Sequence, residues 1–356
     1  MKRWIWHTTF LITLLSCLGS QAKPTDTPVS EFKVGVLYWS MNIPGQVAMR
    51  KGLEQQADAL TQLALVNNAA TIKLIPMVAG DGESGIENQI VQMRELIKQK
   101  VDIIIVQPTD NAALVAPLVE ANQANIPVVA YDQYISGGRL SAYLTSNNYL
   151  AGYYDGEYIA SKFPNNKVIK LVLVEYPHVS STVERVDGFL DALKDRQQAF
   201  RILSSYDAVE PIGGHIAGNK ILHDFPKPNS IDVIFTVNDG GGLSVVDVLA
   251  QAGRNEIVVA TIDGDPNSIQ NIRQGRLTHI DSAQFCGPLG AQSMLVAYNL
   301  LNGKTVPKHI LIPVFPITQK TLEHYPGWLG PIPKPFEKPW PSINKMWDNT
   351  LSKSYD

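Results

Sequence analysis

The segment from Val101 to Gln133, VDIIIVQPTDNAALVAPLVEANQANIPVVAYDQ, constrains the fold of this chain most strongly. Its apolar, β-branched run at 101–106 predicts a strand that is buried on both faces of a parallel sheet. Asp110 can then cap a helix with apolar residues at helical spacing, and a second apolar run follows at 126–130. The segment therefore predicts a strand–helix–strand unit, in which Pro117 should bend the helix because it lacks a hydrogen-bond donor.

The same alternation continues on both sides of this unit and predicts an α/β fold. Strands are expected at 33–39, 72–77, 168–174, 201–206, 232–237 and 257–262. Helices are expected at 46–63, 86–99, 148–162, 182–195, 215–224, 241–252 and 266–274. Alternation of this kind is typical of doubly wound parallel sheets. A single sheet of about nine such units would be large, which favours two lobes.

The first 22 residues differ in kind from the rest of the chain. Lys2 and Arg3 precede a mostly apolar stretch at 4–18, and Ser20-Gln21-Ala22 offers small residues where a signal peptidase would cut. The stretch is short for a membrane span, so a cleaved signal peptide at 1–22 is preferred to a retained anchor. A lipoprotein site that leaves a lipidated Cys17 is the less favoured alternative.

Charge and cysteine content narrow the possible partners and bonds. Without Lys2 and Arg3, the 30 basic residues become 28, against 33 acidic ones, which gives no reason to expect a nucleic-acid partner. Cys286 is then the only cysteine of the mature chain, so no disulfide can form within it. A buried apolar role suits Cys286 better than a nucleophile.

Several phrases of the central segment resemble the type I periplasmic solute-binding family, and in particular its ribose-binding branch. They are P-T-D at 108–110, A-N-x-A-x-I-P-V at 121–128, and the acid Asp132 at the end of the second strand. The resemblance covers roughly 33–315. It implies a periplasmic receptor of two similar lobes joined by three hinge crossings, which closes on a small ligand and delivers it to an ABC permease.

Transferred onto this sequence, the resemblance also implies domain boundaries. The crossings fall near 146–147, near 284–285 and near 313–315. One lobe then comprises 33–146 with 285–313, and the other comprises 147–284 with 314–324. Residues 325–356 form an extension, and we expect a monomer.

The resemblance further implies a set of ligand-binding residues at strand ends and at one helix start. They are Asp132, Arg185, Asn238, Asp263 and Gln284, which match the family's acid, its R-x-x-G-F arginine, its N-D asparagine, its D-G-x-P acid and its hinge glutamine. Carboxylate, guanidinium and amide groups suit the vicinal hydroxyls of a sugar. The alternatives are a turn cap for Asp132 and an exposed helix arginine for Arg185.

Two departures from the ribose binders put ribose itself in doubt. Gln133 stands where those proteins have an arginine, and Gly45-Gln46 stands where they have two phenylalanines. An aromatic face for the ligand must then come from elsewhere, and we prefer Trp39, at the end of the first strand, although a core role is the alternative. The other candidates are Tyr38, Tyr131, Tyr134 and Phe285.

No motif favours an enzyme. The chain has no G-x-S-x-G or H-E-x-x-H, and its glycine-rich stretches at 80–85 and 240–242 lack the Lys-Ser/Thr ending of a phosphate-binding loop. The seven histidines are scattered without ligand spacing. We therefore expect no catalytic residue, no metal and no cofactor.

The stretch from Tyr325 to Trp347 departs from the family because it packs six prolines among its aromatic residues. Prolines exclude a regular helix or central strand, and the aromatic rings argue against a solvated tail. An extended segment packed on one lobe is preferred to a partner-docking surface. Because no matched ligand residue lies beyond Gln284, the tail is expected to leave ligand affinity nearly unchanged. It is also the one feature that favours an alternative function, a sensory receptor for a membrane histidine kinase.

Overall fold

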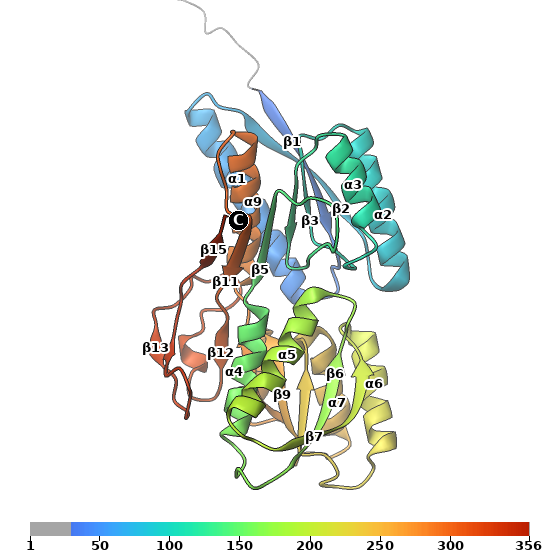
Figure 1. The fold of residues 1–356 in the computed structure, drawn as a ribbon, viewed down its shortest axis with the longest axis vertical. Coiled ribbons are helices and arrows are strands. Elements are labelled where there is room, and N and C mark those ends of the chain that lie inside the picture. Colours follow the sequence, from blue (N-terminus) through green and yellow to red (C-terminus); the bar gives the residue numbers. More distant parts are fainter. Residues whose placement is uncertain (1–29, 356) are drawn as a thin grey trace, which may run out of the picture.

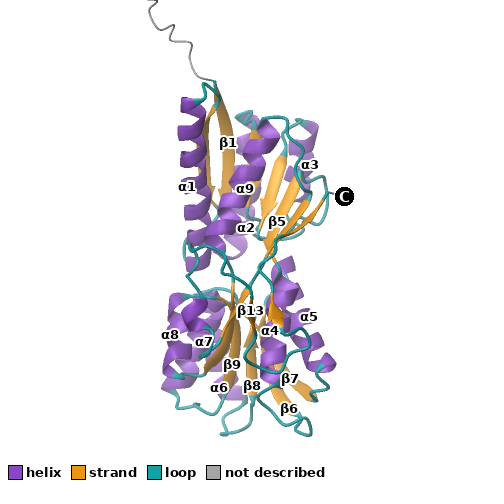
Figure 2. Ribbon diagram, turned by 90° about the vertical axis from the view of Figure 1, so that its left-hand side faces the viewer, coloured by secondary structure: helices purple, strands orange, loops and turns teal. Residues whose placement is uncertain are grey.

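The computed structural model describes residues 30–355, which form two α/β lobes stacked end to end (Figure 1). The predicted signal peptide at 1–22 and Cys17 lie outside these residues. A mostly parallel sheet forms the centre of each lobe, with helices on both faces, as the alternating pattern predicts (Figure 2). None of the helices in the described chain has the length and apolar character that a membrane crossing needs.

The first lobe, here the N-lobe, has the sheet order β15-β11-β5-β4-β3-β1-β2. Its strands are β1 (Glu31–Tyr38), β2 (Thr71–Val78), β3 (Ile103–Val106), β4 (Val128–Tyr131), β5 (Ala142–Ser146), β11 (His309–Ile312) and β15 (Ser352–Ser354). Helices α1 (Pro44–Val66) and α9 (Cys286–Leu301) cover one face, and α2 (Gly82–Lys98) and α3 (Val115–Gln123) cover the other (Figure 1). Only β15 runs antiparallel to its neighbour.

The second lobe, the C-lobe, repeats this arrangement with the sheet order β12-β10-β9-β8-β6-β7. Its strands are β6 (Ile169–Glu175), β7 (Phe200–Asp207), β8 (Val233–Thr236), β9 (Val258–Asp263), β10 (Thr278–Ala283) and β12 (Phe315–Ile317). Its helices are α4 (Asn148–Ala160), α5 (Ser180–Asp195), α6 (Pro211–Asp224), α7 (Asp239–Gln251) and α8 (Pro266–Gln274). The buried runs of β6 and β8 pack against α4 and α5 on one face and against α6 and α7 on the other.

Several elements were not expected from the sequence pattern, among them β5, β10, β11, β12 and α9. Strand β10, THIDSA, has no apolar run, and β5, AYLTS, has one of only three residues before Thr145 and Ser146, so the burial of their polar side chains depends on polar partners within the fold. Pro117 also differs from expectation. The helix starts only at Val115, so Pro117 lies in its first turn, where no intrahelical donor is lost, while Asp110 accepts from the turn before it.

The chain passes between the two sheets at three places. It leaves the N-lobe after β5 and enters α4, returns from β10 into α9, and leaves again from β11 into β12. A hydrogen bond from Asn147 N to Ile312 O joins the first and third passages. Ser146 Oγ donates to Gln284 Oε1 at 2.8 Å and joins the first passage to the second.

Residues 325–354, called the C-terminal strap below, are packed against both lobes. Trp340 and Trp347 are buried. A two-stranded ribbon of β13 (Phe336–Glu337) and β14 (Met346–Trp347) contacts the C-lobe helix η1 (Leu322–His324), because the ring of Phe336 stacks on that of His324. The strap ends as β15, which pairs with β11. The tail is therefore extended, as expected, but it does not stay on one lobe, because β15 completes the N-lobe sheet.

Candidate functional site

All seven residues that the sequence predicts to bind a ligand line one cavity between the two lobes. Trp39, Asp132 and Asn238 follow β1, β4 and β8, and Asp263 ends β9. The cavity therefore lies at the carboxyl ends of these strands, where open α/β sheets bind ligands. About 400 Å³ of empty space lies among the lining residues, a volume that includes space open to solvent. The seven residues are between 3% and 6% exposed: Trp39, Asp132, Gln133, Arg185, Asn238, Asp263 and Gln284.

Asp132 follows directly on β4 and adopts a left-handed backbone conformation with φ of 66°. Asp tolerates this region better than most residues. Its Oδ2 accepts a 2.8 Å hydrogen bond from Gln107 Nε2, and its carbonyl accepts one from Thr145 Oγ1. Burial raises the pKa of the Asp132 carboxyl, while the Gln107 bond opposes that rise. One bond leaves the carboxylate further acceptor capacity toward the cavity.

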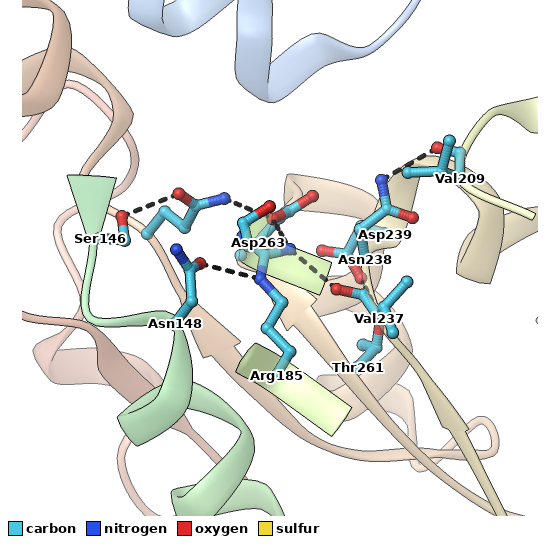
Figure 3. Close-up of polar contacts among 12 residues, drawn as sticks. Ser146, Asn148, Arg185, Val209, Val237, Asn238, Asp239, Thr261 and Asp263 are labelled. Atoms are coloured by element: carbon cyan, nitrogen blue, oxygen red, sulfur yellow. Dashed lines mark hydrogen bonds and ion pairs between the residues drawn. The ribbon is translucent and has the colours of Figure 1, made fainter. Parts of the chain in front are cut away.

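Arg185 lies in the second turn of α5 and is held by three elements of the C-lobe. Its Nε donates to Asn148 Oδ1, and its Nη1 donates both to Val237 O and to Asp263 Oδ1, as Figure 3 shows. The exposed-helix alternative is wrong, because the side chain is 3% exposed. With Nε and Nη1 committed, Nη2 is the group that can donate to a ligand.

Asp263 ends β9 with a φ of 137°, which is rare for a residue other than glycine. Its Oδ1 accepts from Arg185 at 3.1 Å and from Gln284 Nε2 at 2.6 Å. Burial raises the pKa of Asp263, and the Arg185 guanidinium opposes the rise. Two buried carboxylates hold the next peptide units, since Gly264 N donates to Asp281 and Asp265 N donates to Asp239.

Asn238 has a structural role that the sequence reasoning did not weigh. Its Oδ1 accepts from Gly241 N and caps the N-terminus of α7, while its Nδ2 donates to Val209 O (Figure 3). The amide therefore reaches the cavity with both groups already bonded. Any ligand contact of Asn238 must use its second N–H or a remaining lone pair.

Trp39 is the one member of the five aromatic candidates that lines the cavity. Tyr38, Tyr131 and Phe285 are fully buried in the core, and Tyr134 is 43% exposed outside the cavity. Gly45 and Gln46 also line it, so the start of α1 contributes an amide and a bare backbone in place of aromatic rings. The aromatic surface of the cavity thus comes from the end of β1.

Bonds across the cleft join the two lobes at the edge of the cavity. Ser181 N, from α5, donates to Gln133 Oε1 of the N-lobe at 3.3 Å, and Ser180 N donates to Asn111 Oδ1. Gly82 N donates to Glu210 Oε1 at a further point. The structure therefore shows the lobes closed on each other.

Ser181 is a cavity residue that the sequence reasoning missed. Its hydroxyl is buried with no hydrogen-bond partner among residues 30–355, which makes it available to a ligand. Gln107 was missed as well, although it supports Asp132 and accepts from Trp39 N through its Oε1. Its position directly after β3 was the available signal, because side chains at strand ends face the cleft.

The cavity suits a small neutral polar molecule. Carboxylate acceptors, a guanidinium donor and amides surround one indole ring, and the charged groups already neutralise each other in part. No group of His, Cys, Asp and Glu side chains in the described chain is placed to hold a metal ion. Cys286 is fully buried at the start of α9, and burial raises the pKa of its thiol, which argues against a nucleophilic thiolate.

A family model described as "Periplasmic binding protein domain" matches residues 34–305. Among curated proteins, the ribose import binding protein of Escherichia coli K12 is 26% identical over 298 residues, which cover 83% of this chain and 94% of the relative. The ribose import binding protein of Bacillus subtilis 168 is 27% identical over 317 residues, or 87% and 96% of the two chains.

Solved structures agree with this arrangement of two lobes. A galactofuranose binding protein superposes with a TM-score of 0.71 at 20% identity, over 82% of this chain and 96% of that one. The myo-inositol binding protein of Caulobacter gives a TM-score of 0.70 at 21% identity, over 83% and 95%. At these identities the likeness establishes the fold.

Proposed function

This chain belongs to the periplasmic binding proteins of type I, in the ribose-binding-like family of sugar receptors, and we propose that it binds a monosaccharide or related polyol in the cavity between its lobes. The proposed ligand residues are Trp39, Asp132, Gln133, Arg185, Asn238, Asp263 and Gln284, with Ser181 added. The names of the relatives support a sugar, since they include ribose, fructose and galactofuranose binders.

The observation that carries the proposal is the pairing of buried acids with buried donors around one indole face. Asp132 approaches from the N-lobe, while Asp263 and Arg185 approach from the C-lobe. A polyol hydroxyl can donate to one carboxylate and accept from the guanidinium at the same time. Because the two lobes supply different partners, full binding requires closure, and the ligand in turn stabilises the closed state.

The proposal includes a periplasmic location and delivery of the ligand to an ABC permease. It is supported by the periplasmic family and by the import function in the names of the relatives. The signal-peptide pattern at the start of the sequence agrees with export. We propose that the protein acts as a monomer without a cofactor.

A thermal-shift panel tests the ligand class directly. Purified protein is heated with D-ribose, D-allose, L-arabinose, myo-inositol and glycerol, with sodium chloride as a non-binding control. A ligand present at about 100 times its Kd stabilises the folded state by about 2.7 kcal/mol, which is readily measured as a rise in melting temperature. The same rise must disappear in Arg185→Met. No rise with any sugar or polyol would contradict the proposal.

The burial of two strap tryptophans weakens the feature that favoured the sensory alternative. Trp340 and Trp347 of the C-terminal strap are buried against the chain itself, so they do not form a free aromatic surface for a kinase. The transport proposal is therefore preferred. Gene neighbourhood separates the two: permease and ATPase genes support transport, and a histidine kinase gene supports sensing.

A further inference from the structure

Two of the three passages between the lobes contact the C-terminal strap. Tyr325 and Trp328 lie at the passage from β10 into α9, and the Nε1 of Trp347 donates to Val314 O at the passage from β11 into β12. The strap lies beyond residue 305, where the match to the family model ends. We infer that Tyr325 and Trp328 are positioning residues of the candidate sugar site, acting through the main chain of Gln284 and Asp263.

Trp328 bonds to both lobes at once. Its indole Nε1 donates to Asp263 O at 2.6 Å in the C-lobe, and its own carbonyl accepts from Gly287 N at 2.8 Å in α9 of the N-lobe. Its ring lies beside the cavity wall, because a Cβ added at Gly45 would lie 3.8 Å from Trp328 Cζ2. Trp328 therefore connects a ligand-site carbonyl, through its side chain, to the opposite lobe, through its own main-chain carbonyl.

Tyr325 supports the main chain of Gln284, the residue whose side chain bonds to Asp263. Its hydroxyl donates to Gln284 O at 2.8 Å, and its ring packs against Phe285 and Phe315. Gln284 carries the amide that bonds to Asp263 Oδ1. The strap thus holds the backbone of both members of that pair.

Asp263 needs such support because its φ of 137° is unfavourable for a residue with a side chain. A conformation of this kind persists where surrounding bonds over-determine it. Here the peptide N–H groups after Asp263 are bound by Asp281 and Asp239, and its carbonyl accepts from Gln284 N as well as from Trp328. Loss of the indole donor should loosen this segment locally.

This inference deepens the proposed function and rests on it for its effect on affinity, but its primary test needs no ligand. The variants are Tyr325→Phe, which removes the hydroxyl donor and keeps the ring, and Trp328→Phe, which removes the indole donor and leaves a smaller aromatic ring. The matched control is Trp340→Phe, whose indole donates to Glu157 Oε2 inside the C-lobe, away from the cavity. Hydrogen–deuterium exchange of the ligand-free proteins is compared at 262–266 and 284–287.

We expect amide exchange at these two segments to be roughly three- to tenfold faster in the first two variants. The loss of one typical hydrogen bond shifts the local opening equilibrium by about this factor. The control should exchange there as the parent protein does. Parental rates in Trp328→Phe and Tyr325→Phe, or equal acceleration in Trp340→Phe, would overturn the inference.

A second arm measures the Kd for D-ribose by calorimetry on the same three variants. We expect weaker binding in Trp328→Phe and Tyr325→Phe and parental affinity in Trp340→Phe. A general loss of stability would not produce this difference between the variants. If D-ribose does not bind the parent protein, D-ribose is not the ligand. The exchange rates at 262–266 and 284–287 still test the positioning role of Tyr325 and Trp328. The earlier expectation that removal of the tail leaves affinity unchanged is replaced by an expected loss.

Discussion

Lys338 Nζ of the C-terminal strap lies 2.8 Å from Glu157 Oε2 of α4, and their side chains are 1% and 0% exposed. Glu157 also accepts from Trp340 Nε1, Ser342 Oγ and Ile343 N. This one buried carboxylate therefore anchors the strap to the C-lobe. Burial lowers the pKa of Lys338, and the Glu157 bond opposes that change.

Lys338→Met should destabilise the protein by about 3–5 kcal/mol, because removal of one partner leaves a buried charge uncompensated. Urea unfolding followed by circular dichroism measures the change. The double variant Glu157→Gln with Lys338→Met should recover part of the loss, since a neutral amide can still accept from the strap. The control Lys194→Met breaks an exposed pair with Asp191 and should leave the urea midpoint nearly unchanged.

Asp132→Ala should weaken binding of the sugar by at least about tenfold, because a charge-assisted bond contributes about 1.5–3 kcal/mol. Asp132→Asn should preserve the fold and have a milder effect on affinity, because the amide retains one acceptor. Asparagine also tolerates the left-handed backbone at this position, whereas Asp132→Ala adds strain. Calorimetry measures the affinity. Asp102→Asn is the matched control, because Asp102 accepts from Lys33 N at an exposed site outside the cavity. Unchanged affinity in both Asp132 variants would reduce the carboxylate to a structural role.

Stability should fall as pH rises from about 4 to about 8. Burial raises the pKa of Asp281 to about 8 and raises that of Asp239 well above its usual range. In the unfolded chain these carboxyls titrate near 3.9, so between the two values the folded state binds more protons, and ionisation at higher pH favours unfolding.

Urea midpoints at pH 5, 7 and 9 check this dependence. Asp281→Asn should flatten it, because an amide imitates the neutral acid and can still accept from Gly264 N. Asp58→Asn on the exposed side of α1 is the control and should retain the parental slope. If stability depended on pH as steeply in Asp281→Asn as in the parent protein, Asp281 would not be the group responsible for the dependence.

Trp39 should report ligand binding by its fluorescence, because it is the indole that lines the cavity. Trp39→Phe should abolish most of the change that a saturating sugar produces and should weaken binding, since a smaller ring covers less of the ligand. Trp347→Phe, at a fully buried position outside the cavity, should keep the change. A full response in Trp39→Phe would place the aromatic contact elsewhere.

Much of the fold was readable from the sequence because local patterns and global structure agree. Apolar runs such as 101–106 can be satisfied only inside a parallel sheet, and the alternation with amphipathic helices fixed the class. The strand-end positions of Asp132 and Asp263 also placed them at the cleft, since parallel strands end at a common edge. Both residues do line the cavity, although their role in binding stays a prediction.

Other features were decided by tertiary contacts alone. Strand β10, with the sequence THIDSA, has no apolar run. Its Ser282 can be buried because the hydroxyl donates a hydrogen bond to Asp155 of α4, a helix far away in the sequence. The strap could be predicted as packed, yet its path depended on one acid, Glu157, and two carbonyls, Asp263 O and Gln284 O. Backbone carbonyls look the same in every residue, so a partner of this kind leaves no trace in the sequence and appears only when the chain is folded.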